Sequence, residues 1–309
     1  MENQTVSASV RKRRIRKEIT AWLMAVWPLV GFCLFGFIPL VLSVYLSFTK
    51  LTSFDFSAAK FIWLDNYIEL FTDPDFYLAI TNTLIYALSM PITLVLGLII
   101  AVLLHTGLPG SKFFRSVFFI PYVCSIVAVS AMWKWMLNTD FGIVNGFIRA
   151  LGGEGIPWLT EAGWYRVSLL IIIIWSGTGF NIILFQAALA NVNKSYYEAA
   201  DLDGANAFQK FFSLTLPAIS PTTFYLVIMG FIGCLQVYTP MQVMANPAPF
   251  GPDNAGLTIV FYLVYSLRDG LVTRGMGLAS AIAWILAAAI IIITILNFKI
   301  SRKWVHYDE

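Results

Sequence analysis

Side chains that could perform acid–base, nucleophilic or metal chemistry are scarce in this sequence and do not cluster. The chain has two histidines, His105 and His306, and neither has a partner carboxylate within the long apolar segments. Its three cysteines, Cys33, Cys124 and Cys234, all lie in apolar runs, where a free thiol behaves as a small hydrophobic side chain. Their spacing fits neither a metal site nor a disulfide framework, and no phosphate-binding loop of the form GxxxxGK[ST] is present. The sequence therefore predicts neither an enzyme nor a chain with its own ATP site.

Charged and amide side chains gather instead in one stretch, Tyr196–Pro217, between two of the most apolar parts of the chain. This stretch, YYEAADLDGANAFQKFFSLTLP, contains six of them. Ser195 and Glu198 have the spacing of a capping box, which predicts a helix that begins at Tyr196. Gly204 is expected to end this helix, because glycine adopts the left-handed backbone conformation at little cost.

A second short helix is predicted directly after this break. Asn206 and Gln209 repeat the cap spacing, and Leu216-Pro217 is expected to stop the helix. Its apolar face, read at helical spacing, comprises Phe208, Phe211, Phe212 and Thr215. The whole connector, Asn191–Pro221, is longer than the roughly two to eight residues usual between bundled helices. It is therefore either an amphipathic connector at the membrane surface or a docking element for a partner.

The composition indicates that membrane-spanning helices position these residues. Of the 309 residues, 59% are hydrophobic and 12% are charged, and the mean hydropathy is +0.76, whereas a soluble domain carries about 25% charged residues. The net charge of +3 does not suggest nucleic-acid binding. About 20 apolar residues cross a bilayer, so the charge-free segments predict an all-α, polytopic membrane protein. The six predicted transmembrane helices are Ala21–Phe48, Ala79–His105, Val117–Leu137, Val167–Ala190, Thr222–Ala245 and Gly277–Ile300.

The basic residues predict how these spans are oriented. With the N-terminus inside, thirteen Lys and Arg residues fall on the inner side and six on the outer side. Both termini are then cytoplasmic. The predicted domains are a basic N-terminal segment (residues 1–20), a six-span membrane domain (residues 21–300) with a cytoplasmic connector (residues 191–221), and a cytoplasmic tail (residues 301–309). The apolar run Gly256–Leu267 is too short to cross, so we expect an interfacial or re-entrant helix on the outer side.

The predicted spans contain no Asp or Glu. Transporters that run on protons or sodium usually need ionisable groups inside the membrane. A self-contained secondary transporter of a small polar solute is therefore a disfavoured function for this chain. A membrane-bound enzyme or scaffold is another alternative. Energy for transport is expected to come from outside this chain.

Polar residues in the fourth and fifth predicted spans could line a path for an uncharged solute. The segments WSGTGFN and GCLQVYTPMQ combine glycines, which make room, with hydrogen-bonding side chains at Ser176, Asn181, Gln236 and Tyr238. Small and polar residues are also the usual contacts between packed transmembrane helices, and that alternative stays open for each of them.

The connector resembles a known motif. Glu198-Ala199-Ala200, three residues, Gly204, and later Leu216-Pro217 are similar to the EAA motif of the membrane subunits of binding-protein-dependent ABC importers. The likeness extends over most of the chain to sugar-importing permeases related to the maltose and glycerol-3-phosphate systems. It is carried by FIWLDNYIELFTDPDF (Phe61–Phe76), NTLIYAL (Asn82–Leu88), GLPGSKFFRSVFFIPYV (Gly107–Val123) and GIVNGFI (Gly142–Ile148). The fold implied is that of a type I ABC importer permease, in which the first connector helix is a coupling helix.

This resemblance implies roles for particular residues. Those implied to couple the chain to an ATPase subunit are Glu198, Ala199, Ala200, Asp203 and Gly204. With the polar residues above, the expected substrate path comprises Ser176, Gly177, Phe180, Asn181, Gln236 and Tyr238. The loop Asn246–Gly256 is expected to reach toward a binding protein, although Pro247-Ala248-Pro249 stands where the family often has Gly-Gly-Pro.

The resemblance also implies partners and a location. The partners are a second permease subunit in a heterodimer, two ATPase subunits that bind ATP and Mg²⁺, and an extracytoplasmic solute-binding protein. The substrate implied is a carbohydrate, expected to be an oligosaccharide, and the chain itself is expected to hold no cofactor. The location implied is the bacterial plasma (inner) membrane, with several spans.

Overall fold

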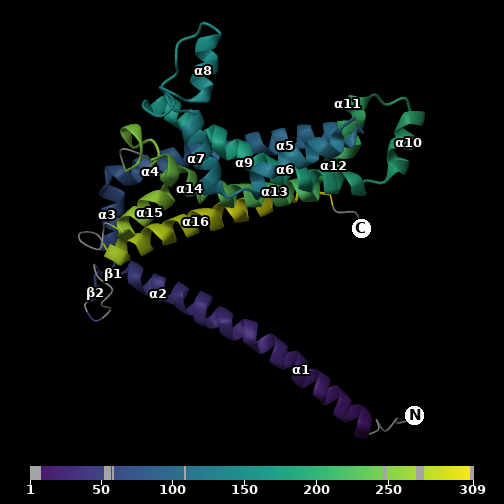
Figure 1. Ribbon diagram of the computed structural model, residues 1–309. Coiled ribbons are helices and arrows are strands. Elements are labelled where there is room, and N and C mark those ends of the chain that lie inside the picture. Colours follow the sequence, from purple (N-terminus) through teal and green to yellow (C-terminus); the bar gives the residue numbers. More distant parts are fainter. Residues whose placement is uncertain are drawn as a thin grey trace.

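The computed structural model describes residues 8–51, 57, 59–107, 109–245, 249–268 and 275–306. Regular structure in these residues is almost entirely helical (Figure 1). The exception is an antiparallel ladder of two-residue strands, β1 (Thr49–Lys50) and β2 (Lys60–Phe61). The predicted helical class is confirmed, and the ladder is too short to leave an alternating pattern in the sequence.

Among the described residues, five helices are long and apolar enough to cross a membrane, or six if one sharply bent pair counts as a single span. The five are Arg13–Ser47, Pro74–His105, Ala162–Asn191, Ser220–Met244 and Gly275–Ser301. Each overlaps a predicted span, because the absence of charged residues is what an apolar membrane interior requires. The exact number of spans remains a prediction.

The first of these helices diverges from the rest of the molecule (Figure 1). It consists of α1 (Ala8–Phe32), the π-helical η1 (Cys33–Phe37) and α2 (Ile38–Ser47). Only the α2 portion packs on the bundle, against α16 (Gly275–Ser301). None of its most apolar window is buried within the chain. A continuous apolar surface of this kind fits a lipid or protein environment rather than water.

A close contact between two long helices forms the centre of the bundle. The span Pro74–His105 consists of α4 (Pro74–Ala87) and α5 (Ser89–His105), and α5 packs along α9 (Ala162–Asn191). A Cβ atom added at Gly97 would lie 2.5 Å from Cβ of Asn181. The small residue therefore lets the two helix backbones approach, as is common in membrane bundles.

The third predicted span, Val117–Leu137, is broken. Helices α6 (Ser111–Val123) and α7 (Ile126–Met136) are bent by 99° relative to each other. Cys124 and Ser125 have extended backbone conformations, which interrupt the helical hydrogen bonding at the bend. The prediction of a single helix here is therefore wrong, and Pro121, which lies inside α6 three residues before the break, was the available signal.

The fifth span is also interrupted, although it lies where it was predicted. It consists of α13 (Ser220–Leu235) and α14 (Thr239–Met244), separated by non-helical residues 236–238. The following helix, α15 (Ile259–Arg268), has ten residues and is too short to cross. This confirms a short helix in the region of Gly256–Leu267, and its position on the outer side of the membrane stays a prediction.

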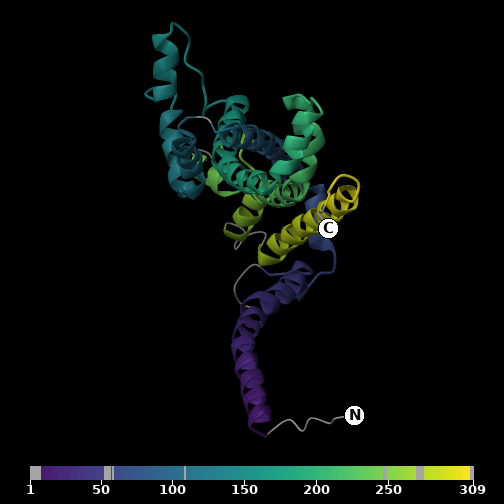
Figure 2. The ribbon, with the colours of Figure 1, turned by 90° about the vertical axis from the view of Figure 1, so that its right-hand side faces the viewer.

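The two ends of the bundle carry different elements (Figures 1 and 2). The connector end, which faces the viewer in Figure 2, carries α10 (Lys194–Leu202), α11 (Ala207–Lys210), the π-helical η3 (Phe211–Thr215) and α12 (Leu216–Ala218). The loop end carries α3 (Asp65–Thr72), the 3₁₀ turn η4 (Pro252–Asn254) and α15, and α8 (Ile143–Ala150) extends sideways from the bundle (Figure 1). The start of α1 and the end of α16 both lie toward the connector end.

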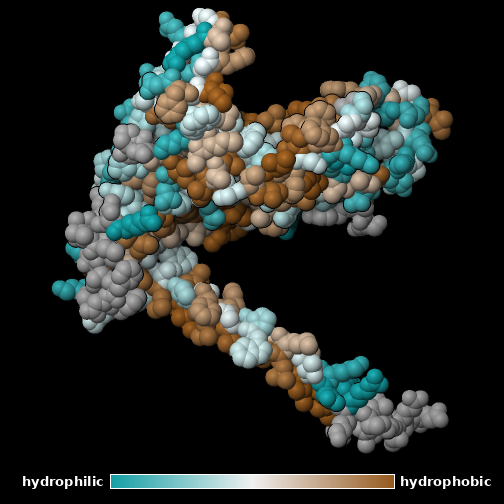
Figure 3. All heavy atoms as spheres, viewed as in Figure 1, coloured by the Kyte–Doolittle hydropathy of each residue, from teal (hydrophilic) through white to brown (hydrophobic). Residues whose placement is uncertain are grey.

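Two clusters of buried side chains hold the bundle together. The cluster at the loop end is the larger and includes Phe76, Tyr86, Tyr165, Tyr262 and Leu278. The cluster at the connector end includes Ala101, Ile182, Phe185, Leu189 and Leu226. The outward surface of the spans is largely hydrophobic, with hydrophilic side chains gathered around α10 and near the start of α1 (Figure 3). This distribution is the one expected of a protein whose middle is surrounded by lipid.

Candidate functional site

Helix α10 is fixed at both ends by its own chain. At the start, Oδ1 of Asn193 accepts a hydrogen bond from the Ser195 N–H at 3.0 Å. At the end, the Ala205 N–H donates to the Ala200 carbonyl at 2.9 Å, which is the Schellman pattern. Gly204 has a φ of 76° and makes the turn. The predicted left-handed glycine is therefore confirmed.

The predicted start of this helix is wrong by two residues. The helix begins at Lys194 rather than Tyr196, and its N-cap is Asn193. The predicted capping box of Ser195 and Glu198 therefore does not form. Both Asn and Ser are good cap residues, but Ser195 lies inside the first helical turn, where its own N–H is the group that is capped.

The residues with an implied coupling role lie together on this helix, away from the bundle. No residue of α10 is buried. Glu198, Ala199, Asp203 and Gly204 are exposed, and Ala200 is half-buried. Exposure leaves these side chains free to contact another protein.

One residue of this helix, Leu202, escaped the sequence analysis. It is 90% exposed, more than any other large hydrophobic side chain that the structure describes. It lies between two acidic residues, Asp201 and Asp203, and that pattern was the available signal. An apolar side chain at the tip of a polar helix gives a partner a hydrophobic contact.

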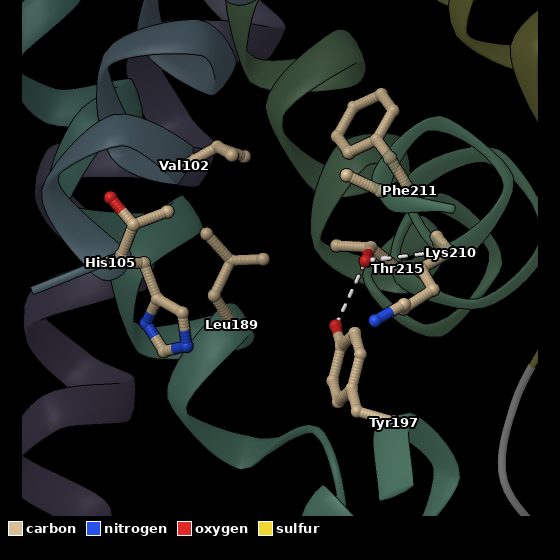
Figure 4. Close-up of a pocket in the computed structure, with 9 residues that line it drawn as sticks. Val102, His105, Leu189, Tyr197, Lys210, Phe211 and Thr215 are labelled. Atoms are coloured by element: carbon tan, nitrogen blue, oxygen red, sulfur yellow. Dashed lines mark hydrogen bonds between the residues drawn. The ribbon is translucent and has the colours of Figure 1, made fainter. Parts of the chain in front are cut away.

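Two side-chain contacts attach α10 to the second half of the connector. The hydroxyl groups of Tyr197 and Thr215 are 2.9 Å apart and share a hydrogen bond (Figure 4). Lys210 forms an ion pair with Asp201, whose side chain is well exposed. Because the ion pair is accessible to water, its contribution is expected to be small. The Tyr197–Thr215 bond is the better-shielded of the two.

A cavity of about 370 Å³ separates the connector from the ends of α5 and α9. In Figure 4, side chains from α5 and α9 form one wall and side chains from the connector form the other. The labelled residues are Val102, His105, Leu189, Tyr197, Lys210, Phe211 and Thr215. The connector is therefore joined to the bundle mainly at its two ends, where α9 leads into it and α13 leaves it.

The second half of the connector confirms the predicted capping box and the predicted helix end, and adds a π turn that was not predicted. Asn206 and Gln209 form the predicted capping box, with hydrogen bonds of 2.8 and 2.9 Å. The predicted stop at Leu216-Pro217 is confirmed to within one residue, because the helix runs through η3 and α12 and ends at Ala218. The Leu216 N–H bonds to the Phe211 carbonyl, five residues back. This widened π turn directly before the proline lets the chain remain helical.

The predicted apolar face of this helix is split. Phe211 and Thr215 line the cavity next to the bundle. Phe208 is 72% exposed and Phe212 is 48% exposed, and their rings pack on each other at a centroid distance of 4.6 Å. Phe208 and Phe212 are four residues apart, and so are Phe211 and Thr215, so the two pairs lie on different sides of the helix.

A second cavity, of about 400 Å³, lies among the spans and contains part of the predicted substrate path. Gly177, Phe180 and Asn181 line it, from α9. The side chains of Ser89, Thr93 and Tyr122 on neighbouring helices line it as well, together with Met229, Gly230 and Gly233 of α13. Tyr122 stacks on Phe180 with ring centroids 5.1 Å apart. The contributions of α5 and α6 were not predicted, because the expected path residues all lay in the fourth and fifth predicted spans.

The other three predicted path residues do not line this cavity. The Ser176 hydroxyl donates to the Ile172 carbonyl of its own helix at 2.8 Å. Gln236 lies in the break between α13 and α14 and is exposed. Tyr238 packs edge-on against Phe261 at 5.4 Å. In this conformation Ser176 is bonded within its own helix and Tyr238 packs against α15, and a path role for these three residues stays a prediction.

Comparison with known proteins shows which family has this architecture. The family model described as "Binding-protein-dependent transport system inner membrane component" matches residues 93–306. The permease protein YesP of Bacillus subtilis, described as a probable ABC transporter permease, is 34% identical over all of this chain and 99% of its own length. The lactose transport system permease LacF of Rhizobium radiobacter is 32% identical, over 97% of this chain and 99% of its own.

Further relatives and solved structures agree. The arabinooligosaccharide transport system permease AraP of Halalkalibacterium halodurans is 32% identical, over 91% of this chain and 87% of its own. A chain of the bacterial alginate ABC transporter, solved in complex with an alginate pentasaccharide-bound periplasmic protein, superposes with a TM-score of 0.82. It is 23% identical and covers 94% of this chain and 96% of its own length, so it supports the fold alone. With most of its length matched by the family model and by these relatives, the chain belongs to the inner membrane components of binding-protein-dependent transport systems, the permease subunits of ABC transporters.

Proposed function

We propose that this chain is one of two permease subunits of an ABC importer that brings a carbohydrate, most simply an oligosaccharide, into the bacterial cell. A second permease completes the translocation path. Two ATPase subunits bind ATP and Mg²⁺, and an extracytoplasmic binding protein delivers the substrate. The relatives named for lactose and arabinooligosaccharide transport support the substrate class.

The observation that carries this proposal is the position of α10 between the two helices that form most of the path cavity. Helix α9 contributes Gly177, Phe180 and Asn181 and continues through Val192 into α10. Helix α13, which contributes Met229 and neighbouring residues, begins directly after the connector. A displacement of α10 is therefore passed to both walls of the path. Its short length and its caps allow it to move as one rigid element.

The outward face of α10 has the chemistry of a docking surface. Glu198 and Asp203 supply carboxylates, Ala199 and Ala200 allow close approach of another backbone, and Leu202 adds an exposed apolar side chain. In the proposed complex this face enters a cleft of the ATPase subunit. Closure of the two ATPase subunits around ATP moves α10 and switches the path between its outward-open and inward-open forms.

The path cavity suits an uncharged, hydroxyl-rich solute. Its polar side chains, among them Thr93 and Asn181, offer neutral hydrogen-bonding groups, and the stacked rings of Tyr122 and Phe180 offer aromatic surface. Sugars present both hydroxyl groups and apolar C–H faces, so this combination matches them. We propose Gly177, Phe180 and Asn181 as path residues of this subunit.

The orientation proposed places the connector end in the cytoplasm. The excess of Lys and Arg on the predicted inner segments supports it. The start of α1, the end of α16 and the connector lie toward the same end of the bundle (Figure 1), as two cytoplasmic termini require. The loop end then faces the extracytoplasmic side.

The proposal is tested with the assembled transporter in lipid nanodiscs. Glu198→Lys reverses a charge on the docking face, so substrate-stimulated ATP hydrolysis is expected to fall at least tenfold, or the ATPase subunits to dissociate during purification. If assembly and stimulation both survive, the coupling role is wrong.

A charge reversal at another exposed glutamate shows whether the loss of stimulation is specific to Glu198 or follows from the changed net charge. Glu154→Lys changes an exposed glutamate in the loop after α8 and is expected to retain both assembly and stimulation. Uptake by this chain alone, in vesicles without ATP or ATPase subunits, would instead favour the secondary-transporter alternative.

A further inference from the structure

The loop that precedes α15 is attached to the bundle by a buried amide side chain. Asn82 of α4 is completely buried. Its Nδ2 group donates one hydrogen bond to the Asn254 carbonyl and one to the Leu257 carbonyl, each of 3.0 Å. Both amide protons are thus used on backbone groups about 170 residues further along the chain.

Two further side chains on the same face of α4 bind this loop. The Thr83 hydroxyl oxygen accepts a hydrogen bond from the Ile259 N–H at 3.0 Å. The Tyr86 hydroxyl donates to the Ala255 carbonyl at 2.8 Å. Residues three and four apart lie on one side of a helix, so Asn82, Thr83 and Tyr86 act together. We name these three residues the α4 clamp.

Arg166 of α9 determines how the Asn82 amide is oriented. Its Nε and Nη2 groups donate to Oδ1 of Asn82 at 3.3 and 3.2 Å. A guanidinium group has only donors, so it requires the amide oxygen on its own side. The NH₂ group must then point to the two carbonyls. The cation therefore excludes the flipped amide, in which Nδ2 would face Arg166 and Oδ1 would face the carbonyls.

The loop held in this way has an unusual backbone. Asp253 and Asn254 have φ values of 47° and 53°, and Gly251 has a φ of 75° with a ψ of −175°. Non-glycine residues in the left-handed region persist only where surrounding contacts enforce them. The α4 clamp supplies these contacts. The turn it enforces leaves Asp253 exposed at the loop end.

We propose that Asn82, oriented by Arg166, is a positioning residue that fixes the Pro252–Asn254 turn so that the Asp253 carboxylate is presented to an extracytoplasmic protein partner. The partner offers a basic side chain or N–H donors to this carboxylate. The assignment of that partner as the solute-binding protein rests on the function proposed above. A pre-fixed turn binds with a smaller loss of conformational entropy than a mobile one.

The clamp is tested first without any assumption about transport. Hydrogen exchange followed by mass spectrometry is measured for peptides within residues 250–262 in the assembled complex. Asn82→Ala is expected to speed exchange in this loop at least tenfold, and Thr83→Val, which keeps the side-chain shape, to speed it at Ile259. Thr81→Val is the control, because Thr81 is exposed and its hydroxyl donates to the Tyr77 carbonyl of its own helix rather than to the loop. Unchanged exchange in both Asn82→Ala and Thr83→Val overturns the clamp.

The presentation of Asp253 is tested by adding increasing concentrations of substrate-loaded binding protein to the transporter and measuring the rate of ATP hydrolysis. Asn82→Ala and Asp253→Asn are each expected to raise the half-saturating concentration about tenfold, whereas the rate at saturation changes less than twofold. A purely structural defect would lower the rate at saturation instead. A half-saturating concentration equal to that of the wild type in both variants overturns the presentation. If the wild-type complex shows no stimulation at all, the proposed function fails while the exchange result still decides the clamp.

Discussion

The two ends of the bundle hold their loops in opposite ways. At the loop end, buried side chains of α4 and α9 bind the backbone before α15, and Tyr262 bonds to Asp73 at 2.6 Å. At the connector end, α10 has no buried residue and is held by its own caps, the Tyr197–Thr215 bond and an exposed ion pair. One loop is built into the bundle, and the other lies beside it.

This difference indicates which end can move at low cost. An unpaired polar group costs more in a buried site than in water, so the loop end resists any separation of its parts. The contacts of α10 are local and partly exposed, so the helix can shift as a unit and still keep its caps. A fixed loop end and a movable connector end are what the proposed coupling of an ATPase subunit to the path requires.

The comparison predicts its largest effect at a glycine of the loop end. A Cβ atom added at Gly251 would lie 2.6 Å from Cζ of the buried Tyr165 ring, and the backbone conformation there is nearly exclusive to glycine. Gly251→Ala is expected to lower the free energy of unfolding by about 2–6 kcal/mol, from strain and overpacking together. The measurement is the thermal midpoint of the purified complex in detergent.

Gly163→Ala is the control for this substitution. Gly163 lies in the first turn of α9, and a Cβ atom there meets nothing within 4 Å. Alanine in a helix is expected to be neutral or stabilising by up to about 1 kcal/mol. Equal midpoints for Gly251→Ala and the wild type would contradict a rigid loop end.

A smaller effect is expected from a single hydroxyl group of the α4 clamp. Tyr86→Phe leaves the buried Ala255 carbonyl without the hydrogen bond that Tyr86 donates. The expected loss of stability is about 1–3 kcal/mol, the cost of a buried unsatisfied acceptor. Thermal denaturation of the complex measures it. Tyr77→Phe also removes a hydroxyl–carbonyl bond, but at an exposed site, and should stay within about 0.5 kcal/mol of the wild type.

The glycine at the connector end provides the counterpart of Gly251. Gly204 has a φ of 76°, but a Cβ atom there meets nothing within 4 Å. Gly204→Ala therefore adds backbone strain of about 1–2 kcal/mol without a clash. The expected result is faster hydrogen exchange at the end of α10, with a thermal midpoint close to that of the wild type. Gly204→Asn should show less of this effect, because asparagine tolerates the left-handed region better.

Local rules predicted the connector better than they predicted the loop end. The turn at Gly204 and the box of Asn206 and Gln209 depend on neighbouring residues, and both are confirmed. The choice of Asn193 over Ser195 as the cap was missed, because two good cap residues lie two positions apart. The spans were located by their lack of charge.

The remaining features depend on contacts between distant segments. The bonds from Asn82 join positions 172 and 175 residues apart in sequence. No spacing rule relates such residues, and Asn82 by itself resembles any polar residue in a transmembrane helix. The bend at Cys124 and Ser125 had one local signal, Pro121 inside α6, but a proline in a transmembrane helix does not by itself indicate a bend of 99°.

The smallest effect is expected at the hydrogen bond that links the two halves of the connector. Tyr197→Phe removes the hydrogen bond to Thr215, and this bond is only partly shielded from water. The expected loss is about 0.5–1.5 kcal/mol. Thr215→Val removes the same bond from the other side, so the double variant should be no less stable than the weaker single variant. Additive losses would mean that Tyr197 and Thr215 each stabilise the connector through separate contacts. In that case α10 would be held by more than this one hydrogen bond and would be less free to move than the comparison of the two ends indicates.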